Sequence, residues 1–117
     1  MNNTTSFQIG IDRISFYTPR YKLSLESLAE YRGYKSSKFK DDLGQESMGL
    51  IPPNEDIVTM AVNAALPIVD EQRAKKIKLV LFATESAIDQ AKAAGIYVHH
   101  YLGLPPDCRV MEVKQAC

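Results

Sequence analysis

The sequence predicts an α/β fold in which helices pack on a parallel sheet. Two strand-like segments, residues 77–83 and 109–115, are separated by a long helical pattern at residues 86–102. Such alternation of strands and helices is typical of layered α/β proteins. Residues 77–83 are almost continuously apolar, which indicates a strand that is covered on both faces. The composition, 45% hydrophobic and 24% charged residues among 117, is that of a globular protein.

The N-terminal part predicts one strand followed by one helix. Residues 8–17 alternate apolar and polar side chains with a phase shift near Asp12, which predicts a strand that carries a β-bulge. Ser24 can cap a short helix that runs to Tyr31, because its hydroxyl can accept a hydrogen bond from a first-turn N–H. Gly33 is expected to end this helix. The expected buried face comprises Leu25, Leu28 and Ala29.

Residues 34–53 are predicted to form a loop, which at this length is functional, disordered or built around short helices. Asn54 is predicted to cap the next helix, with Glu55 and Asp56 in the first turn, where they complement the helix dipole. Pro67 is expected to kink or end that helix. The apolar face of the helix comprises Ile57, Val58, Ala61, Val62, Ala65, Leu66 and Val69.

The C-terminal part predicts a helix at residues 86–102 and a last strand at residues 109–115. Gly103 and Pro105 are expected to close the helix. Its expected inward residues are Ile88, Ala91, Ala94, Val98 and Leu102. A buried parallel strand is normally covered by the helix that follows it, and no helix follows residues 109–115. The pattern therefore predicts that the chain is incomplete.

Charge and composition argue against several classes of function. Fourteen basic residues balance fourteen acidic ones, which gives no electrostatic footprint for nucleic acid or an anionic membrane. The apolar stretches are far shorter than the roughly 18 residues of a membrane span, and the polar N-terminus lacks the regions of a signal peptide. We therefore expect a cytoplasmic protein. The spacing of Cys and His residues, with His99 and His100 adjacent, does not predict a metal site.

Two reactive side chains follow predicted strands, and strand ends are where α/β sheets expose functional residues. Glu85 is either a catalytic carboxylate or a residue that only complements the dipole of the next helix. Cys117 is either a thiol whose pKa is lowered by a following helix, or a small buried residue. Cys108 is interpreted as a packing residue. A disulfide between the two cysteines has no further support in the sequence.

Two sequence motifs surround these side chains. They are Glu112-x-Lys114-x-Ala116-Cys117 and Thr84-Glu85-Ser86-x-x-Asp89-x-x-Lys92. The first resembles the signature around the nucleophile of bacterial 3-hydroxy-3-methylglutaryl-CoA (HMG-CoA) synthases, and the second resembles the segment that carries that family's catalytic glutamate. Three weaker matches, which fall in the family's order, are Gly10-Ile11-Asp12 with Ile14-Ser15-Phe16, Leu43-Gly44-Gln45, and Asp56-Ile57-Val58-Thr59.

The resemblance implies a thiolase-like layered fold, usually in a homodimer. Residues 1–117 would form only the N-terminal half, an apparently truncated part of a condensing-enzyme domain. The resemblance also implies that the Cys117 thiolate takes the acetyl group of acetyl-CoA and that Glu85 acts as the general base on the acetyl methyl group. The resulting enolate would attack acetoacetyl-CoA. CoA thioesters would then be substrates, and no separate cofactor is expected.

Substrate binding and proton transfer show two departures from the family. Lys35 and Ser36 occupy the position where the family has an Asp-Ala or Asp-Pro pair that contacts the thioester substrate. The acidic residue has become basic, so Lys35 is either a phosphate contact or a solvated surface residue. Neither His99 nor His100 matches the catalytic histidine of the family.

Two other functions remain open at this point. A polyketide β-branching synthase performs the same chemistry on an acyl chain that is tethered to an acyl carrier protein, and the segment from Cys108 to Cys117 is close to that subgroup. Leu43-Gly44-Gln45 is closer to the mevalonate-pathway enzymes of isoprenoid biosynthesis. A non-catalytic thiolase-fold binding subunit is the third interpretation, which the presence of both Glu85 and Cys117 disfavours.

Overall fold

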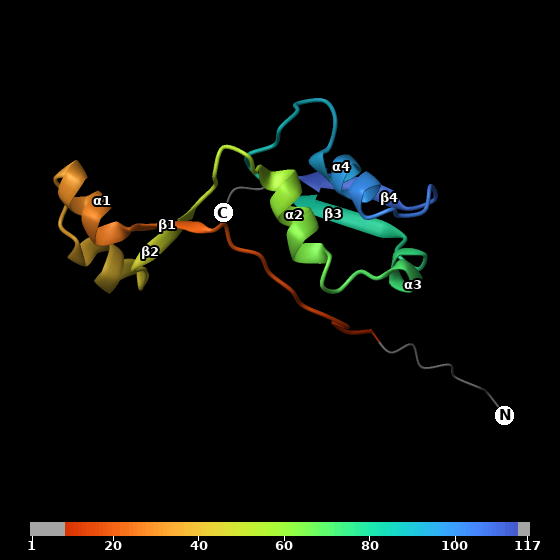
Figure 1. Cartoon of the computed structure of the whole chain (residues 1–117), viewed down its shortest axis with the longest axis horizontal. Helices are drawn as coiled ribbons and strands as arrows, with labels where there is room; N and C mark the ends of the chain where they lie inside the picture. Colours follow the sequence, from red (N-terminus) through yellow and green to blue (C-terminus); the bar gives the residue numbers. More distant parts are fainter. Residues whose placement is uncertain (1–8, 115–117) are drawn as a thin grey trace.

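The computed structural model describes residues 9–114, and it separates into two groups of elements (Figure 1). The first group comprises β1 (Tyr21–Ser24), α1 (Leu25–Arg32), the π-helix η1 (Lys38–Asp42) and β2 (Ser47–Leu50). The second comprises α2 (Ile57–Ala65), α3 (Glu71–Ala74), β3 (Leu79–Ala83), α4 (Ala94–Tyr101) and β4 (Arg109–Val113). The predicted α/β class is confirmed.

The second group is a layered unit built on two parallel strands. β3 pairs with β4 in a register that places Leu81 opposite Met111 and Ala83 opposite Val113. Helix α4 packs on both strands, and α2 packs on α4 (Figure 1). The buried contacts between these layers come from Val58, Ala94 and Val98, with Phe82 of β3 packed against them. A second small core joins α3 to the segment before β4 and comprises Ala74, Leu104 and Cys108.

The opposite face of this sheet is open, which corrects the expectation of a strand covered on both sides. Leu81 is 63% exposed, and the neighbouring side chains on that face are also exposed. These neighbours are Leu79, Met111 and Val113. Residues 9–114 therefore cover only one face of the β3–β4 sheet. The structure is also more extended than a compact domain of this length, with a radius of gyration of 19.1 Å against about 13 Å.

The first strand is found later in the chain than predicted. Residues 9–19 contain no regular element, and Ile9 is 97% exposed. The alternating pattern there describes a side-chain preference, but a strand also needs a partner for its backbone groups. The observed β1 pairs with β2 in an antiparallel manner, Tyr21 opposite Leu50. The predicted loop at residues 34–53 thus contains β2 as well as η1.

Helix caps explain which helix predictions hold. Ser24 caps α1, and Gly33 ends it with a φ of 68°, as expected. Helix α2 is capped by Asp56 and not by Asn54, because Asp56 and Thr59 form a reciprocal capping box. The side chain of Asp56 accepts the Thr59 N–H at 2.8 Å, which lowers the pKa of the Asp56 carboxyl. Helix α2 ends at Ala65, before Pro67, as predicted.

The predicted helix at residues 86–102 forms only over its second half, as α4. Asp89 accepts hydrogen bonds from the N–H groups of Ala91 and Lys92, at 2.7 and 3.0 Å, and this local turn replaces helical hydrogen bonding. Of the expected inward residues, Ala94 and Val98 are buried, whereas Ile88 is exposed. None of the helices within residues 9–114 is both long enough and apolar enough to cross a membrane.

Gly95 sets the close approach of α4 to the sheet. A Cβ atom at this position would lie 2.8 Å from Cγ1 of Val110 and 3.0 Å from Cβ of Phe82. Gly95→Ala is therefore expected to lower the free energy of unfolding by about 1–3 kcal/mol through overpacking. Alanine's better helix propensity, worth about 1 kcal/mol, offsets only part of this loss.

Urea unfolding measures the change in the free energy of unfolding. The control is the double variant Gly95→Ala with Val110→Ala, because the second substitution removes the Val110 methyl group that the new Cβ would meet. We expect the double variant to recover part of the loss. A Gly95→Ala protein that is more stable than the parent would contradict the packing observed here.

Candidate active site

The parallel pairing of β3 with β4 brings the two predicted catalytic segments to one edge of the sheet. The backbone N–H of Thr84 donates to the carbonyl of Val113 at 3.1 Å, so the carboxyl ends of the two strands are joined directly. Glu85 follows Thr84 in the chain. Cys117 lies outside the described residues, four positions after Val113 in the sequence. Carboxyl ends of parallel strands are where sites of α/β proteins lie.

Glu85 is not in the first turn of a helix, which removes the interpretation that it only complements a helix dipole. It lies in an irregular segment, residues 84–93, and its side chain is exposed. Within this segment the Ser86 N–H donates to Oγ1 of Thr84 at 3.1 Å. A strong carboxylate base needs a dry environment, and residues 9–114 alone do not enclose Glu85.

Glu112 is a residue near this edge of the sheet to which sequence reasoning assigned no separate role. Its Oε2 accepts the backbone N–H of Ala94 at 2.7 Å, and its Oε1 lies 3.3 Å from Nζ of Lys114. The hydrogen bond from Ala94, followed by the contact with Lys114, lowers the pKa of the Glu112 carboxyl, although desolvation and the charge of Asp89 oppose this shift. The sequence carried no signal for this contact beyond the place of Glu112 in the motif that ends at Cys117, because the helix was expected to begin at Ser86 and not at Ala94.

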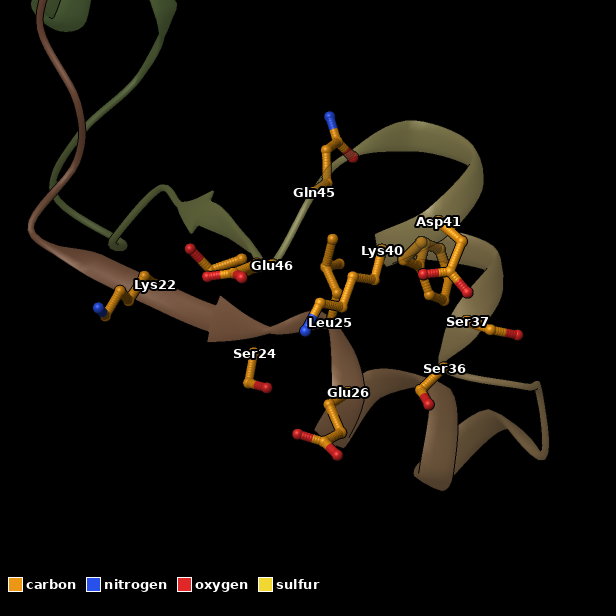
Figure 2. Close-up of a pocket in the computed structure, with 12 residues that line it drawn as sticks. Lys22, Ser24, Leu25, Glu26, Ser36, Ser37, Lys40, Asp41, Gln45 and Glu46 are labelled. Atoms are coloured by element: carbon orange, nitrogen blue, oxygen red, sulfur yellow. The ribbon is translucent and has the colours of Figure 1, made fainter.

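A polar hollow of about 800 Å³ lies in the other group of elements, between β1, α1, η1 and β2 (Figure 2). Ser36 lines this hollow, whereas Lys35 is exposed and does not line it, and substrate binding by the two residues stays a prediction. Figure 2 shows the Lys40 side chain extending from η1 toward Leu25. The remaining charged and hydroxyl groups around the hollow are those of Lys22, Ser24, Glu26, Ser37, Asp41, Glu46 and Ser47.

The charges around this hollow are mixed. Three carboxylates outnumber two lysine ammonium groups by one charge, and four serine hydroxyls also line the hollow. Such a lining can donate and accept hydrogen bonds, but it does not concentrate positive charge as a polyphosphate site does. The hollow therefore suits a neutral, hydrogen-bonding group more than a multiply charged anion.

Cys108 and His99 have structural roles in this part of the chain. Cys108 is 7% exposed and packs with Ala74 and Leu104, so the prediction of a packing residue is confirmed. The Nε2 atom of His99 lies 3.0 Å from the carbonyl oxygen of Pro105, which holds the turn after α4. Among residues 9–114, no group of three or more His, Cys, Asp or Glu side chains could hold a metal ion.

Known proteins match the chain over almost its whole length. No family model matches it. The hydroxymethylglutaryl-CoA synthase of Enterococcus faecalis is 42% identical over 109 residues, which cover 93% of this chain and 28% of that protein. The polyketide-biosynthesis 3-hydroxy-3-methylglutaryl-ACP synthase PksG of Bacillus subtilis is 40% identical over 111 residues, covering 92% of this chain and 26% of its own length. The chain thus spans little more than a quarter of these relatives.

Solved structures agree with the sequence matches. An HMG-CoA synthase complexed with CoA superposes with a TM-score of 0.84 at 41% identity, covering 92% of this chain and 28% of the other. The HMG synthase of the curacin biosynthetic pathway, in complex with holo donor-ACP, has a TM-score of 0.80 at 39% identity over 92% of this chain and 27% of its own. The fold is therefore part of a thiolase-like layered fold of the kind that condensing enzymes use. Within that class, the chain belongs to the HMG-CoA synthase family.

The burial of Cys108 is expected to make its thiol unreactive. A thiol that is packed among apolar side chains is inert until the structure opens. Alkylation of Cys108 by iodoacetamide in the native protein is expected to be about 100-fold slower than in urea, as measured by peptide mass spectrometry over time. The urea-unfolded protein is the control for intrinsic reactivity. Equal rates in both conditions would show that the second core is not formed.

Proposed function

We propose that the protein carrying this chain is an HMG-CoA synthase, an acyltransferase that condenses acetyl-CoA with acetoacetyl-CoA through an acetyl-cysteine intermediate. Family membership supports the proposal, and one structural observation carries it. That observation is the hydrogen bond between Thr84 and Val113, which joins the segment of Glu85 to the strand that leads toward Cys117. Residues 1–117 would be the N-terminal part of the condensing domain.

Cys117 is the proposed nucleophile. Its thiolate attacks the thioester carbonyl of acetyl-CoA, CoA leaves as its thiol, and an acetyl thioester forms on the enzyme. The other cysteine of the chain, Cys108, is buried in a packing role and is a poor candidate for this step. Covalent catalysis of this kind separates acyl transfer from carbon–carbon bond formation, so each step has its own chemical demands.

Glu85 is the proposed general base. It removes a proton from the acetyl methyl group of acetyl-Cys117, and the resulting enolate attacks the ketone of acetoacetyl-CoA. Water then hydrolyses the thioester and frees Cys117. The strand-end position of Glu85 supports this role, because Glu85 follows β3 at the edge of the sheet where β4 also ends, and Cys117 follows β4 in the sequence. Its exposure means that further parts of the active protein must exclude water around it.

The polar hollow is the proposed contact surface for the amide-rich arm of a thioester substrate. Ser36 lines it, and serine hydroxyls suit neutral amide groups. Lys35 remains a proposed contact from outside the hollow, where its ammonium group could meet a phosphate. A homodimer and a cytoplasmic location, both expected from the sequence, stay predictions.

A carrier-protein substrate is the second candidate. The match to PksG, at 40% identity, is almost as high as the match to the E. faecalis enzyme, and the curacin-pathway synthase was solved with a donor-ACP. A polyketide β-branching synthase would use the same Cys117 and Glu85 chemistry on a tethered β-ketoacyl chain. The two functions therefore differ in the carriers of the thioester substrates and not in the catalytic residues.

The first experiment is intact-protein and peptide mass spectrometry of the natural full-length protein after incubation with acetyl-CoA. We expect an acetyl adduct on Cys117, retained in Cys108→Ala and absent in Cys117→Ala. A Cys117 that stays unmodified with acetyl-CoA and, in a separate incubation, with an acetylated carrier protein would overturn the synthase proposal and favour a non-catalytic binding subunit. Acetoacetyl-CoA and acetoacetyl-carrier protein, added separately to the acetylated enzyme, then distinguish the two acceptors by the product that forms.

The role of Glu85 has its own test. Glu85→Gln is expected to keep the acetyl adduct on Cys117 but to slow exchange of the acetyl methyl protons with D₂O by about 10²–10⁴-fold, because general-base catalysis is lost. Mass spectrometry of the acetylated peptide measures this exchange. Glu71→Gln, on the exposed surface of α3, is the matched control. Unchanged exchange in Glu85→Gln would assign the base elsewhere.

A further inference from the structure

The segment that carries Glu85 is attached at both ends to two successive residues of β4. At its start, the Thr84 N–H donates to the carbonyl of Val113 at 3.1 Å. Just after its end, the Ala94 N–H donates to Oε2 of Glu112 at 2.7 Å. Residues 84–93 contain no regular helix or strand. Their position relative to β4 therefore depends strongly on these two attachments.

The second attachment replaces a helix cap that the local sequence does not provide. The residue before α4 is Ala93, and no side chain of its own turn caps the helix. The first backbone N–H groups of a helix have no partners within the helix. Glu112 supplies an acceptor from the neighbouring strand, and its negative charge also interacts favourably with the positive end of the helix dipole.

Asp89 cannot replace Glu112 in this role. Its Oδ1 atom already accepts the N–H groups of Ala91 and Lys92, so it organises the middle of the segment. That turn gives the segment internal order but does not attach it to the sheet. Glu112 makes the attachment, because its backbone belongs to β4 while its carboxylate reaches the start of α4.

The environment of Glu112 keeps this carboxylate in place. Its side chain is 10% exposed, and both oxygens have partners, Ala94 through Oε2 and Lys114 through Oε1. A carboxylate that is largely removed from water needs such partners to remain charged. Glu112 and Lys114 are also two residues of the motif that ends at Cys117, so the attachment and the proposed nucleophile share one short stretch of chain.

We propose that Glu112 is a positioning residue, which sets the place of Glu85 relative to the strand that leads to Cys117 by capping α4 from β4. This role rests on the proposed synthase function. Glu112 does not touch the reacting atoms. Its loss displaces the base segment while leaving the pairing of β4 with β3 unchanged. Proton removal by Glu85 is therefore affected, and acetylation of Cys117 is not.

Three substitutions of Glu112 in the full-length protein separate the effect of side-chain length from the effect of charge. Glu112→Gln keeps an oxygen acceptor at the same reach without the charge. Glu112→Asp keeps the charge but is one methylene shorter, and Glu112→Ala removes both. The readouts are acetylation of Cys117 by acetyl-CoA, exchange of the acetyl methyl protons with D₂O, and hydrogen-exchange protection of the Ala94 amide. Glu71→Gln again serves as the surface control.

We expect Glu112→Ala and Glu112→Asp to slow methyl-proton exchange by about 10- to 100-fold, the loss that small displacements of a catalytic group produce. Both variants should also lose protection of the Ala94 amide. Glu112→Gln should restore much of both properties. The rate of Cys117 acetylation and its KM for acetyl-CoA should change less than about threefold in all three variants, a split that general destabilisation would not produce.

Two outcomes overturn the proposal in distinguishable ways. Normal methyl-proton exchange in Glu112→Ala, with Cys117 still acetylated, rejects the positioning role and leaves the synthase function intact. Absence of Cys117 acetylation in the parent protein, with acetyl-CoA and with an acetylated carrier protein, rejects the synthase function and the positioning role together. Equal loss of acetylation and of methyl-proton exchange in Glu112→Ala shows a purely structural residue and also rejects the positioning role.

Discussion

The parallel pairing of β3 with β4 is the constraint on which the rest of this structure depends. Parallel strands cannot be joined by a tight turn, so the chain must cross over the sheet before it returns. The crossover contains the Glu85 segment and α4, and it ends in the turn that buries Cys108. Because both strands run in the same direction, their carboxyl ends meet at one edge of the sheet. At this edge the backbone N–H of Thr84 donates a hydrogen bond to the carbonyl of Val113. The position of the candidate site follows from this topology.

Burial on one face of the sheet and exposure on the other have one cause, the helices that the described chain provides. Helix α4 comes very close to the strands, because Gly95 has no side chain to hold it away from Val110 and Phe82. The other face has large apolar side chains such as Leu81 and no covering layer within residues 9–114. Parallel sheets are normally covered on both faces. We therefore expect a further layer on the exposed face of the sheet. The relatives, which are more than three times as long as this chain, agree with this expectation.

Carboxylates that accept backbone N–H groups organise much of the irregular chain. Asp56 and Asp70 cap α2 and α3, Asp89 forms the turn before α4, and Glu112 caps α4 from the neighbouring strand. These hydrogen bonds lower the pKa of each group. A lowered pKa in the folded state means that the stabilisation is present above the unfolded pKa, about 4, and is lost as the pH falls through the folded value. Acid therefore weakens the helix starts and the Glu85 segment together.

Local sequence determined the features that depend on neighbouring residues, and tertiary structure determined those that depend on partners. Sequence alone predicted several features, because each signal lies within a few residues. These features are the caps at Ser24 and Gly33, the apolar strand observed as β3, and the motifs that resemble the family. The prediction of Asn54 as the cap of α2 was wrong, because Asp56 is the cap, and the sequence did not show that the helix before Gly103 begins only at Ala94. The first depends on the reciprocal hydrogen bonds between Asp56 and Thr59. The second depends on Glu112, which accepts a hydrogen bond from the N–H of Ala94, 18 residues earlier in the chain. Helix and strand ends are fixed by hydrogen-bond partners, and for α4 and β1 those partners come from distant parts of the chain.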